Sequence, residues 1–364
     1  MIQGAGCRIH EENGPLSQPV LIRRNNQTLS IVLNRPGAVN SLDRKMVQLI
    51  REALDEAEKN PLVKRVLFYG EGEKGFCAGG DVKMMARLVG RGKTEECLDF
   101  LREEYQVDLT VHRLPKPVVV LADGITMGGG LGLCAGADIV LSTERTRSAM
   151  PETRIGFFPD VGATGWMFRK CPPGYPEYLG LTGYEMVGTE CVRVGLTTHS
   201  VSSKDIPLIR TLLEESQPNV SPERAEAAEA ITRLIEPFLQ KEIPSRRAMD
   251  DWVEDYFAGK ATVTSVVEGL RECSVFTDLC GDVFHELSER SPTALVMTLK
   301  LLRRNEGRTM EDVFLNDLHA ARFILSHPDF LEGVRARLLD KDDKPRWQPE
   351  TIEMAEQLAP LLKT

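Results

Sequence analysis

The chain has 364 residues, of which 42% are hydrophobic and 27% charged, as in folded globular proteins and unlike intrinsically disordered ones. Asp and Glu number 54 against 45 Lys and Arg, so the net charge is -9. Duplex nucleic acid requires a broad basic face, so nucleic acid is not expected as a partner. The length suggests about two domains of roughly 150 residues each.

Targeting and metal-binding signals are absent from the sequence pattern. Residues 1–15 mix charges with glycines and have no apolar stretch, so we expect neither a secretory signal nor a mitochondrial presequence. No apolar run approaches the roughly 18 residues of a membrane span, so no membrane partner is expected. The eight cysteines are scattered without a CxxC pair, which predicts reduced thiols in a cytoplasmic protein. No Cys and His cluster has zinc spacing, so we expect no metal.

Strand and helix signals alternate over the first 200 residues. The turn residues Asn25 and Asn26 predict a short hairpin with strands at 21–22 and 29–33. Ser41 is expected to cap an amphipathic helix that ends at Asn60. Further expected elements, in chain order, are a strand at 63–69, a helix from near Asp81, a buried strand at 117–122, a helix after the glycines of 124–130 and a strand at 138–141. This alternation predicts an α/β fold.

The last 160 residues differ from the first 200. A Thr-x-x-Glu pattern at Thr182 predicts a capping box that starts a short helix reaching Val194. Strand signals nearly vanish from about residue 203, and Ser291 followed by Pro292 predicts the start of another helix. We therefore expect a core of residues 1–202 and a helical C-terminal region, 203–364, packed on it.

Two glycine-rich loops, 75–81 and 124–130, each follow an apolar strand and open a helix. The first N–H groups of a helix lack acceptors, and two that converge on one point would form an oxyanion hole. The alternative is that the glycines only serve turns with positive φ. Glycines entering a helix cost about 1 kcal/mol each relative to Ala, which favours a functional role for the pair of loops. A dinucleotide site at 130–135 is disfavoured because its glycines lie beyond the turn.

Two carboxylates, Glu152 and Asp160, lie eight residues apart in an apolar loop that also contains Phe157 and Phe158. Desolvation raises the pKa of a carboxyl group and makes it a usable acid or base near neutrality. The alternative is a pair of ordinary surface acids. The aromatic neighbours favour the functional interpretation.

These segments together resemble the crotonase (enoyl-CoA hydratase/isomerase) superfamily, over almost the whole chain. The run from Asp329 to Ala336, with the segment 340–347 after it, resembles the 3-hydroxyisobutyryl-CoA hydrolase branch. The resemblance implies a spiral of ββα units with a helical C-terminal region. It also implies an acyl-CoA substrate and no separate cofactor, since coenzyme A is part of the substrate. The superfamily often forms trimers, so a homo-oligomer is an open alternative.

The resemblance implies roles for residues at matching positions. The N–H groups of Gly80 and Gly129 would form the oxyanion hole for the thioester carbonyl. The backbone of Ala78 would meet the adenine of CoA, and Glu104 would belong to the substrate site of the hydrolase branch. Four basic residues are candidates for the CoA phosphates by position alone: Arg23, Arg24, Arg35 and Lys116.

The catalytic pair implied by the resemblance is Glu152 and Asp160, the second being peculiar to the hydrolase branch. Hydratases of the superfamily use two glutamates, and the place of the first is occupied here by Gly132. This absence favours a thioester hydrolase for 3-hydroxyisobutyryl-CoA or a similar short 3-hydroxyacyl-CoA, as in valine catabolism. Two alternatives stay open: an enoyl-CoA hydratase or isomerase, and a non-catalytic CoA-binding or scaffold protein.

Overall fold

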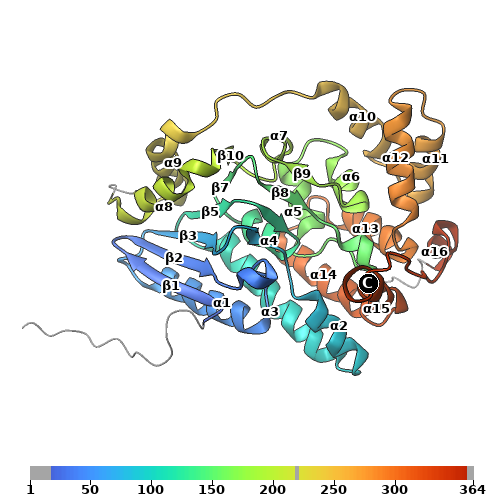
Figure 1. Ribbon diagram of the computed structural model, residues 1–364, viewed down its shortest axis with the longest axis horizontal. Coiled ribbons are helices and arrows are strands. Elements are labelled where there is room, and N and C mark those ends of the chain that lie inside the picture. Colours follow the sequence, from blue (N-terminus) through green and yellow to red (C-terminus); the bar gives the residue numbers. More distant parts are fainter. Residues whose placement is uncertain (1–17, 218–220, 359–364) are drawn as a thin grey trace, which may run out of the picture.

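The computed structural model describes residues 18–217 and 221–358, so the N-terminal segment 1–15 and Cys7 lie outside it. A six-stranded sheet forms the centre of the N-terminal half (Figure 1). Its first two strands form the predicted antiparallel hairpin, and the remaining neighbours pair in parallel. In spatial order the strands are β1 (Val20–Asn25), β2 (Thr28–Leu33), β3 (Arg65–Gly70), β5 (Val118–Ala122), β7 (Ile139–Ser142) and β10 (His199–Ser200).

A second sheet of four short strands lies beside the first. Its order is β4 (Gly75–Cys77), β6 (Ile125–Met127), β8 (Arg147–Ala149) and β9 (Met186–Val187). The chain passes three times from a strand of the first sheet to one of the second, in the pairs β3–β4, β5–β6 and β7–β8. Helices follow the first two pairs, namely α2 (Val82–Gly90), α3 (Thr94–Arg113) and α4 (Gly129–Ala135). This repeated arrangement confirms the predicted α/β fold.

The central strands are buried on both faces, as their apolar sequences predict. In β5, Val118 and Val120 belong to the large hydrophobic core, which α1 (Arg44–Lys59) and α3 also enter. Val119 and Leu121 point to a smaller core on the opposite face. That face is covered by α8 (Ile206–Glu215) and α9 (Arg224–Ile235). Successive side chains of a strand point to opposite faces of the sheet, so alternate residues of β5 enter the two different cores.

The C-terminal region is helical, as predicted, and its helices extend the large core. The Ser291 hydroxyl accepts a hydrogen bond from the Ala294 N–H and caps α13 (Pro292–Asn305), which confirms that predicted start. Within 18–217 and 221–358, no helix is long and apolar enough to cross a membrane. The remaining helices are α5 (Ala163–Lys170), α6 (Tyr175–Thr182), α7 (Glu190–Val194), α10 (Arg247–Phe257), α11 (Val263–Arg271), α12 (Thr277–Ser288), α13 (Pro292–Asn305), α14 (Met310–Ile324), α15 (Pro328–Val334) and α16 (Ile352–Leu358).

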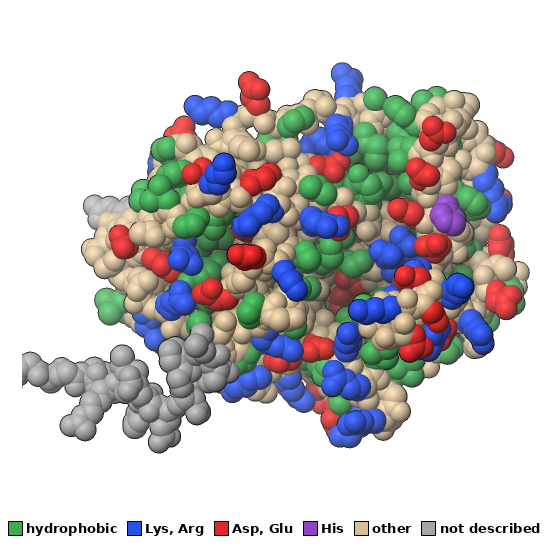
Figure 2. All heavy atoms as spheres, viewed as in Figure 1, with side chains coloured by type: hydrophobic (Ala, Val, Ile, Leu, Met, Phe, Trp, Pro, Cys, Tyr) green, Lys and Arg blue, Asp and Glu red, His purple; other side chains and the backbone are tan. Residues whose placement is uncertain are grey.

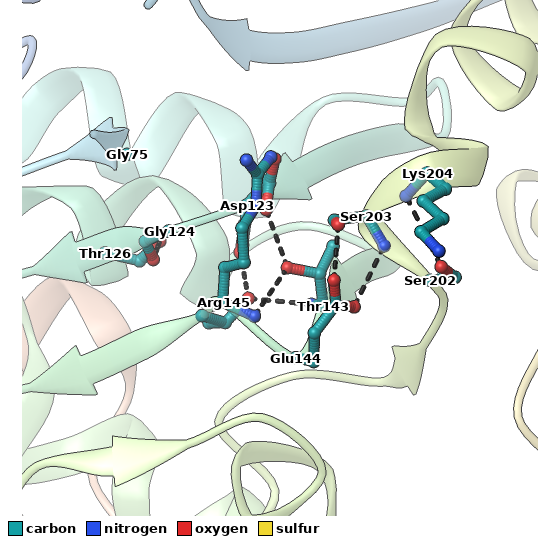
Figure 3. Close-up of polar contacts among 12 residues, drawn as sticks. Gly75, Asp123, Gly124, Thr126, Thr143, Glu144, Arg145, Ser202, Ser203 and Lys204 are labelled. Carbon is teal, nitrogen blue, oxygen red and sulfur yellow. Dashed lines mark hydrogen bonds and ion pairs between the residues drawn. The ribbon is translucent and has the colours of Figure 1, made fainter. Parts of the chain in front are cut away.

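Polar contacts join the end of the central sheet to the start of the helical region (Figure 3). The Thr143 hydroxyl donates to the Asp123 carboxylate at 2.6 Å, and Arg145 forms an ion pair with the same group. The Ser203 N–H donates to Glu144 at 3.0 Å. These contacts therefore fix the position of the chain where it leaves the sheet. The domain boundary at residue 202 stays a prediction.

Two predicted helix starts are wrong. The cap of α1 is Asp43, whose carboxylate accepts the Met46 N–H at 2.9 Å, and Ser41 lies before it. Thr182 ends α6, because Gly183 adopts a left-handed φ of 66° that terminates the helix. A capping-box pattern identifies residue types and cannot distinguish the start of one helix from the end of the preceding one.

The expectation that all cysteines are reduced thiols is also wrong. Cys273 and Cys280 form a disulfide across the turn that leads into α12. Their separation of seven residues lies outside the CxxC pattern, and only the turn brings the two sulfur atoms together. The other described cysteines are free.

Candidate active site

The six residues predicted for catalysis, the oxyanion hole and acyl-CoA binding all line one cavity of about 340 Å³. The cavity lies between the α/β core and the C-terminal region, which contributes Phe330, Arg337, Leu338 and Asp343. Figure 2 shows Lys and Arg side chains gathered around the hollow surface beside α15. The predicted residues in the lining are Ala78, Gly80, Glu104, Gly129, Glu152 and Asp160. Segments far apart in the sequence therefore meet at one place, as the predicted site requires.

The two glycine loops meet because β4 and β6 are parallel neighbours, so their carboxyl ends lie at the same edge. Gly79 has a φ of 91°, and a Cβ atom added to it would lie 3.2 Å from the Gly129 nitrogen. Among the described residues, no acceptor takes a hydrogen bond from the Gly80 or Gly129 N–H. Two free donors thus lie close together on the cavity wall, the arrangement that an oxyanion hole needs.

Glu104 extends from the middle of α3 over these glycines. A Cβ atom added at Gly129 would lie 2.3 Å from its Oε1, and one added at Gly80 would lie 3.6 Å from its Oε2. Only glycine at position 129 leaves room for this carboxyl group. Oε1 has no hydrogen-bond partner within the described chain. Burial, reinforced by the nearby Asp160, raises the pKa of Glu104 well above its ordinary value.

Glu152 begins a short 3-10 helix, η2 (Glu152–Ile155), on the cavity wall. Its side chain is buried, and its Oε2 has no hydrogen-bond partner among the described residues. Phe157 lines the same cavity and stacks on Phe158, with ring centroids 4.7 Å apart. Burial and the charge of Asp160 raise the pKa of Glu152 well above its ordinary value. Phe157 therefore lines the same cavity as Glu152, and the shielding of this carboxylate by the aromatic residues stays a prediction.

Asp160 lies in the loop between η2 and α5, and it is only 8% exposed. The Tyr105 hydroxyl donates a hydrogen bond to its Oδ2 at 2.7 Å. Burial raises the pKa of Asp160 to about 6, and the hydrogen bond from Tyr105 partly opposes that rise. A carboxyl group with this pKa changes its ionisation close to neutrality and is suited to acid–base work.

The space at Gly132 is filled by other side chains. A Cβ atom added there would lie 2.7 Å from Oδ2 of Asp108 and 2.8 Å from the Cβ of Val161. Val161 directly follows Asp160, so the turn that carries Asp160 occupies the place where a larger residue at 132 would extend. The absence of a side chain at position 132 and the turn that carries Asp160 are therefore linked by packing.

None of the four basic candidates for the CoA phosphates lines the cavity. Arg24 is paired with Glu56, and Arg35 forms an ion pair with Asp81 at 3.2 Å. Lys116 donates to the Asn60 carbonyl at 2.7 Å. The basic residues that do line the cavity are Arg154 and Arg337.

Sequence reasoning missed several residues around this site. Arg154 lies inside the loop 150–162, where its charge next to Glu152 was a usable signal. Asp317 is an acid on the apolar face of α14, three and four residues after Phe314 and Val313, and a charge at such a position is unusual. No sequence pattern identifies Arg337 as a site residue, because its position at the cavity depends on tertiary packing. Among the described residues, no cluster of His, Cys, Asp and Glu could hold a metal ion.

The model of the family described as enoyl-CoA hydratase/isomerase matches residues 28–359. The chain belongs to the enoyl-CoA hydratase/isomerase family. Within this family it is 33% identical over 339 residues to the mitochondrial 3-hydroxyisobutyryl-CoA hydrolase of Gallus gallus, covering 92% of this chain and 85% of that one. It is 31% identical to the hydrolase of the same name from Homo sapiens, covering 93% and 86% of the two chains.

Two solved structures are similar over nearly the full chain. An enoyl-CoA hydratase from Rhodobacter sphaeroides has a TM-score of 0.82 at 31% identity and covers 95% of this chain and 97% of its own. A carnitinyl-CoA dehydratase from Mycobacterium thermoresistibile has a TM-score of 0.82 at 30% identity and covers 93% of each chain. The names of these relatives include hydrolases and hydratases, so the reaction must be argued from the site residues.

Proposed function

We propose that the protein is an acyl-CoA thioester hydrolase that cleaves 3-hydroxyisobutyryl-CoA, or a similar short 3-hydroxyacyl-CoA, to the free acid and CoA. One observation carries this proposal. Glu152 and Asp160 share a cavity with the free N–H groups of Gly80 and Gly129, while position 132 has no carboxylate. The names of the hydrolases at 31–33% identity support it.

The proposed oxyanion hole acts on the carbonyl oxygen of the thioester. As a nucleophile adds to the carbonyl carbon, negative charge develops on this oxygen and is stabilised by the N–H groups of Gly80 and Gly129. Losing one such donor typically costs about 3–4 kcal/mol of transition-state stabilisation. The donors are held in place by the strand ends of β4 and β6, so they need no reorganisation during the reaction.

Glu152 has two possible roles in forming the new bond. Its carboxylate can attack the carbonyl carbon, so that the C–S bond breaks, CoA leaves as a thiolate that is then protonated, and water later cleaves the anhydride. Alternatively, Glu152 takes a proton from water as the water oxygen attacks. Both routes give a carboxylate, the CoA thiol and one proton. Asp160 binds the 3-hydroxyl of the substrate or shares the proton transfer.

Two assays on the purified protein test the proposal. Thiol release from 3-hydroxyisobutyryl-CoA, followed with a thiol reagent, is expected to be fast. Hydration of crotonyl-CoA, followed by the loss of ultraviolet absorbance, is expected to be slow. Fast hydration without thiol release would favour the hydratase that the similar solved structures suggest by name. Binding of CoA without either reaction would favour a non-catalytic member.

A single turnover in ¹⁸O-labelled water tests the anhydride route for Glu152. Label recovered in Glu152 itself indicates the anhydride, whereas label found only in the product acid shows that water attacked the acyl carbonyl carbon, either of the thioester or of the anhydride. The cytoplasmic location stays a prediction, since the matched hydrolases are named as mitochondrial proteins. A role in valine catabolism and a homo-oligomeric state also stay predictions.

A further inference from the structure

The turn that follows Asp160 has an unusual backbone. Val161 has a φ of 50° and Gly162 a φ of 74°, so two successive residues are left-handed. A β-branched residue rarely adopts this conformation, which persists only where the surrounding structure holds it. The position of Asp160 therefore depends on contacts that hold this turn.

One of these contacts comes from the C-terminal region. Asp317 of α14 is fully buried, and its Oδ2 accepts a hydrogen bond from the Gly162 N–H at 2.8 Å. A Cβ atom added at Gly162 would lie 2.5 Å from Cε of Met310 and 3.1 Å from Cζ of Phe314, both on α14. The helix thus packs directly against the turn. Burying a carboxyl group is costly, so the position of Asp317 calls for an explanation beyond packing.

The second contact comes from α3. The Tyr105 hydroxyl donates to Oδ2 of Asp160 at 2.7 Å, and its ring is buried. This ring also packs against Phe314, with centroids 5.6 Å apart. Helix α14 therefore supports both the backbone after Asp160 and the side chain that binds the Asp160 carboxylate.

We propose that Asp317 and Tyr105 are positioning residues for Asp160. Asp317 fixes the backbone turn behind Asp160, and Tyr105 fixes the direction of its carboxylate. Neither residue lines the cavity, so both act through Asp160. The C-terminal region therefore helps to build the catalytic turn as well as to line the cavity. The effect on hydrolysis rests on the proposed function, whereas the effect on Asp160 itself does not.

The first experiment measures Asp160 without substrate. A ¹³C-NMR titration of aspartate carboxyl groups, with the Asp160 signal assigned from Asp160→Asn, gives its pKa in the wild type and in Tyr105→Phe. Loss of the phenol donor is expected to raise this pKa by about one unit, because the hydrogen bond favours the ionised form. The titratable groups that face this region from α3, η2 and α14 are Glu104, Tyr105, Asp108, Glu152 and Asp317.

The second experiment uses the full chain and compares two substitutions of Asp317. Asp317→Asn keeps an oxygen that can accept the Gly162 N–H, and kcat is expected to stay within about 3-fold of the wild type. Asp317→Ala removes the acceptor, and kcat is expected to fall at least 10-fold with KM nearly unchanged. In the Asp160→Asn background, Asp317→Ala should reduce kcat by less than 2-fold further, although it lowers the Tm in both backgrounds.

The outcomes distinguish this proposal from the proposed function. An unchanged Asp160 pKa in Tyr105→Phe, or an equal loss from Asp317→Ala with and without Asp160, would overturn the positioning role. If Asp317→Ala does not fold, Tyr105→Phe in the same two backgrounds decides the question. If the wild type hydrolyses no acyl-CoA, the proposed function fails, and the NMR titration still tests the positioning of Asp160.

Discussion

Gly132 and Val161 are in such close contact that a Cβ atom on the glycine would lie 2.8 Å from the Cβ of the valine. Real Cβ contacts are essentially never this short. A side chain at 132 would therefore displace the turn that carries Asp160. The neighbouring turn therefore requires a glycine at position 132, the position where the resemblance to hydratases predicts a glutamate in those enzymes.

The substitution Gly132→Glu is predicted to impair hydrolysis without creating a hydratase. The new side chain would collide with Val161 and bring a second carboxyl group against the buried Asp108. We expect thiol release to fall at least 10-fold and crotonyl-CoA hydration to stay at the wild-type level. Gly281→Ala, where an added Cβ meets nothing within 4 Å, is the matched control. A clear gain of hydration in Gly132→Glu would contradict this account.

Glu152→Gln is predicted to lose at least ~10²-fold in kcat, because the amide can neither attack the carbonyl nor accept a proton. The side chain keeps its size, so the affinity for CoA should change little. Stopped-flow thiol release and calorimetric CoA titration measure the two quantities separately. Glu229→Gln, at an exposed position on α9, serves as the control. Near-normal hydrolysis by the Glu152 variant would refute the assignment.

Much of this site could be predicted from the sequence because its parts lie in short local segments. The glycine loops and the segment from Glu152 to Asp160 carry their chemistry in adjacent residues, and the strands before them have clear apolar patterns. Tyr105 and Asp317 could not be connected to Asp160 in this way. Tyr105 lies 55 residues from Asp160, and Asp317 lies 155 residues from Gly162, to which it is bonded. Such pairings are set by tertiary packing.

The errors in the fold have similar physical causes. Ser41 and Asp43 are both good N-caps, and local preference does not choose between them. The second sheet was missed because its strands have only two or three residues, too short for a period-two pattern to be recognised. Arg35 has the charge for a phosphate contact, yet it bonds to the Ser41 carbonyl and pairs with Asp81.

Buried carboxyl groups in the cavity predict that the protein becomes less stable as pH rises. The pKa of Asp160 is about 6 in the folded protein, against about 4 in an unfolded chain. Between these values the folded state binds more protons, so the free energy of unfolding falls from about pH 4 to beyond pH 6. Glu104 and Glu152 shift in the same direction.

Asp160→Asn tests this linkage. It removes the charge and keeps an acceptor for the Tyr105 hydroxyl, so it is predicted to raise stability at pH 8 by about 1–3 kcal/mol. At pH 4 the difference should nearly vanish. Denaturant unfolding at both pH values measures it, and hydrolysis by the variant should fall. A variant that is less stable than the wild type at pH 8 would contradict the prediction.

The fall of kcat/KM at acidic pH should reflect protonation of Asp160. If the ionised Asp160 accepts the hydrogen bond of the substrate 3-hydroxyl, kcat/KM falls as pH drops through about 6. A pH profile with 3-hydroxyisobutyryl-CoA should show this limb, and a profile with isobutyryl-CoA, which lacks the hydroxyl, should show a weaker dependence. Identical limbs for both substrates would assign the titration to Glu152 or Glu104 instead.

Arg154 is predicted to contribute to the binding of the anionic part of CoA. It lines the cavity, is exposed, and forms no ion pair within the described part of the chain. Arg337, the other arginine of the lining, is already bonded to Asp343 at 2.8 Å. Arg154→Ala is therefore expected to raise KM for acyl-CoA by about 5-fold with kcat nearly unchanged, as for loss of one charge-assisted contact.

The dependence on salt distinguishes a phosphate contact from an indirect effect of Arg154→Ala. Screening weakens exposed charge pairs, so KM of the wild type should rise with salt, and this rise should be smaller in Arg154→Ala. Arg233→Ala, whose side chain is 68% exposed on α9, is the control and should behave like the wild type. Dephospho-CoA esters, which lack the 3′-phosphate, show which phosphate is involved. An equal salt dependence in wild type and Arg154→Ala would exclude Arg154 from the CoA site.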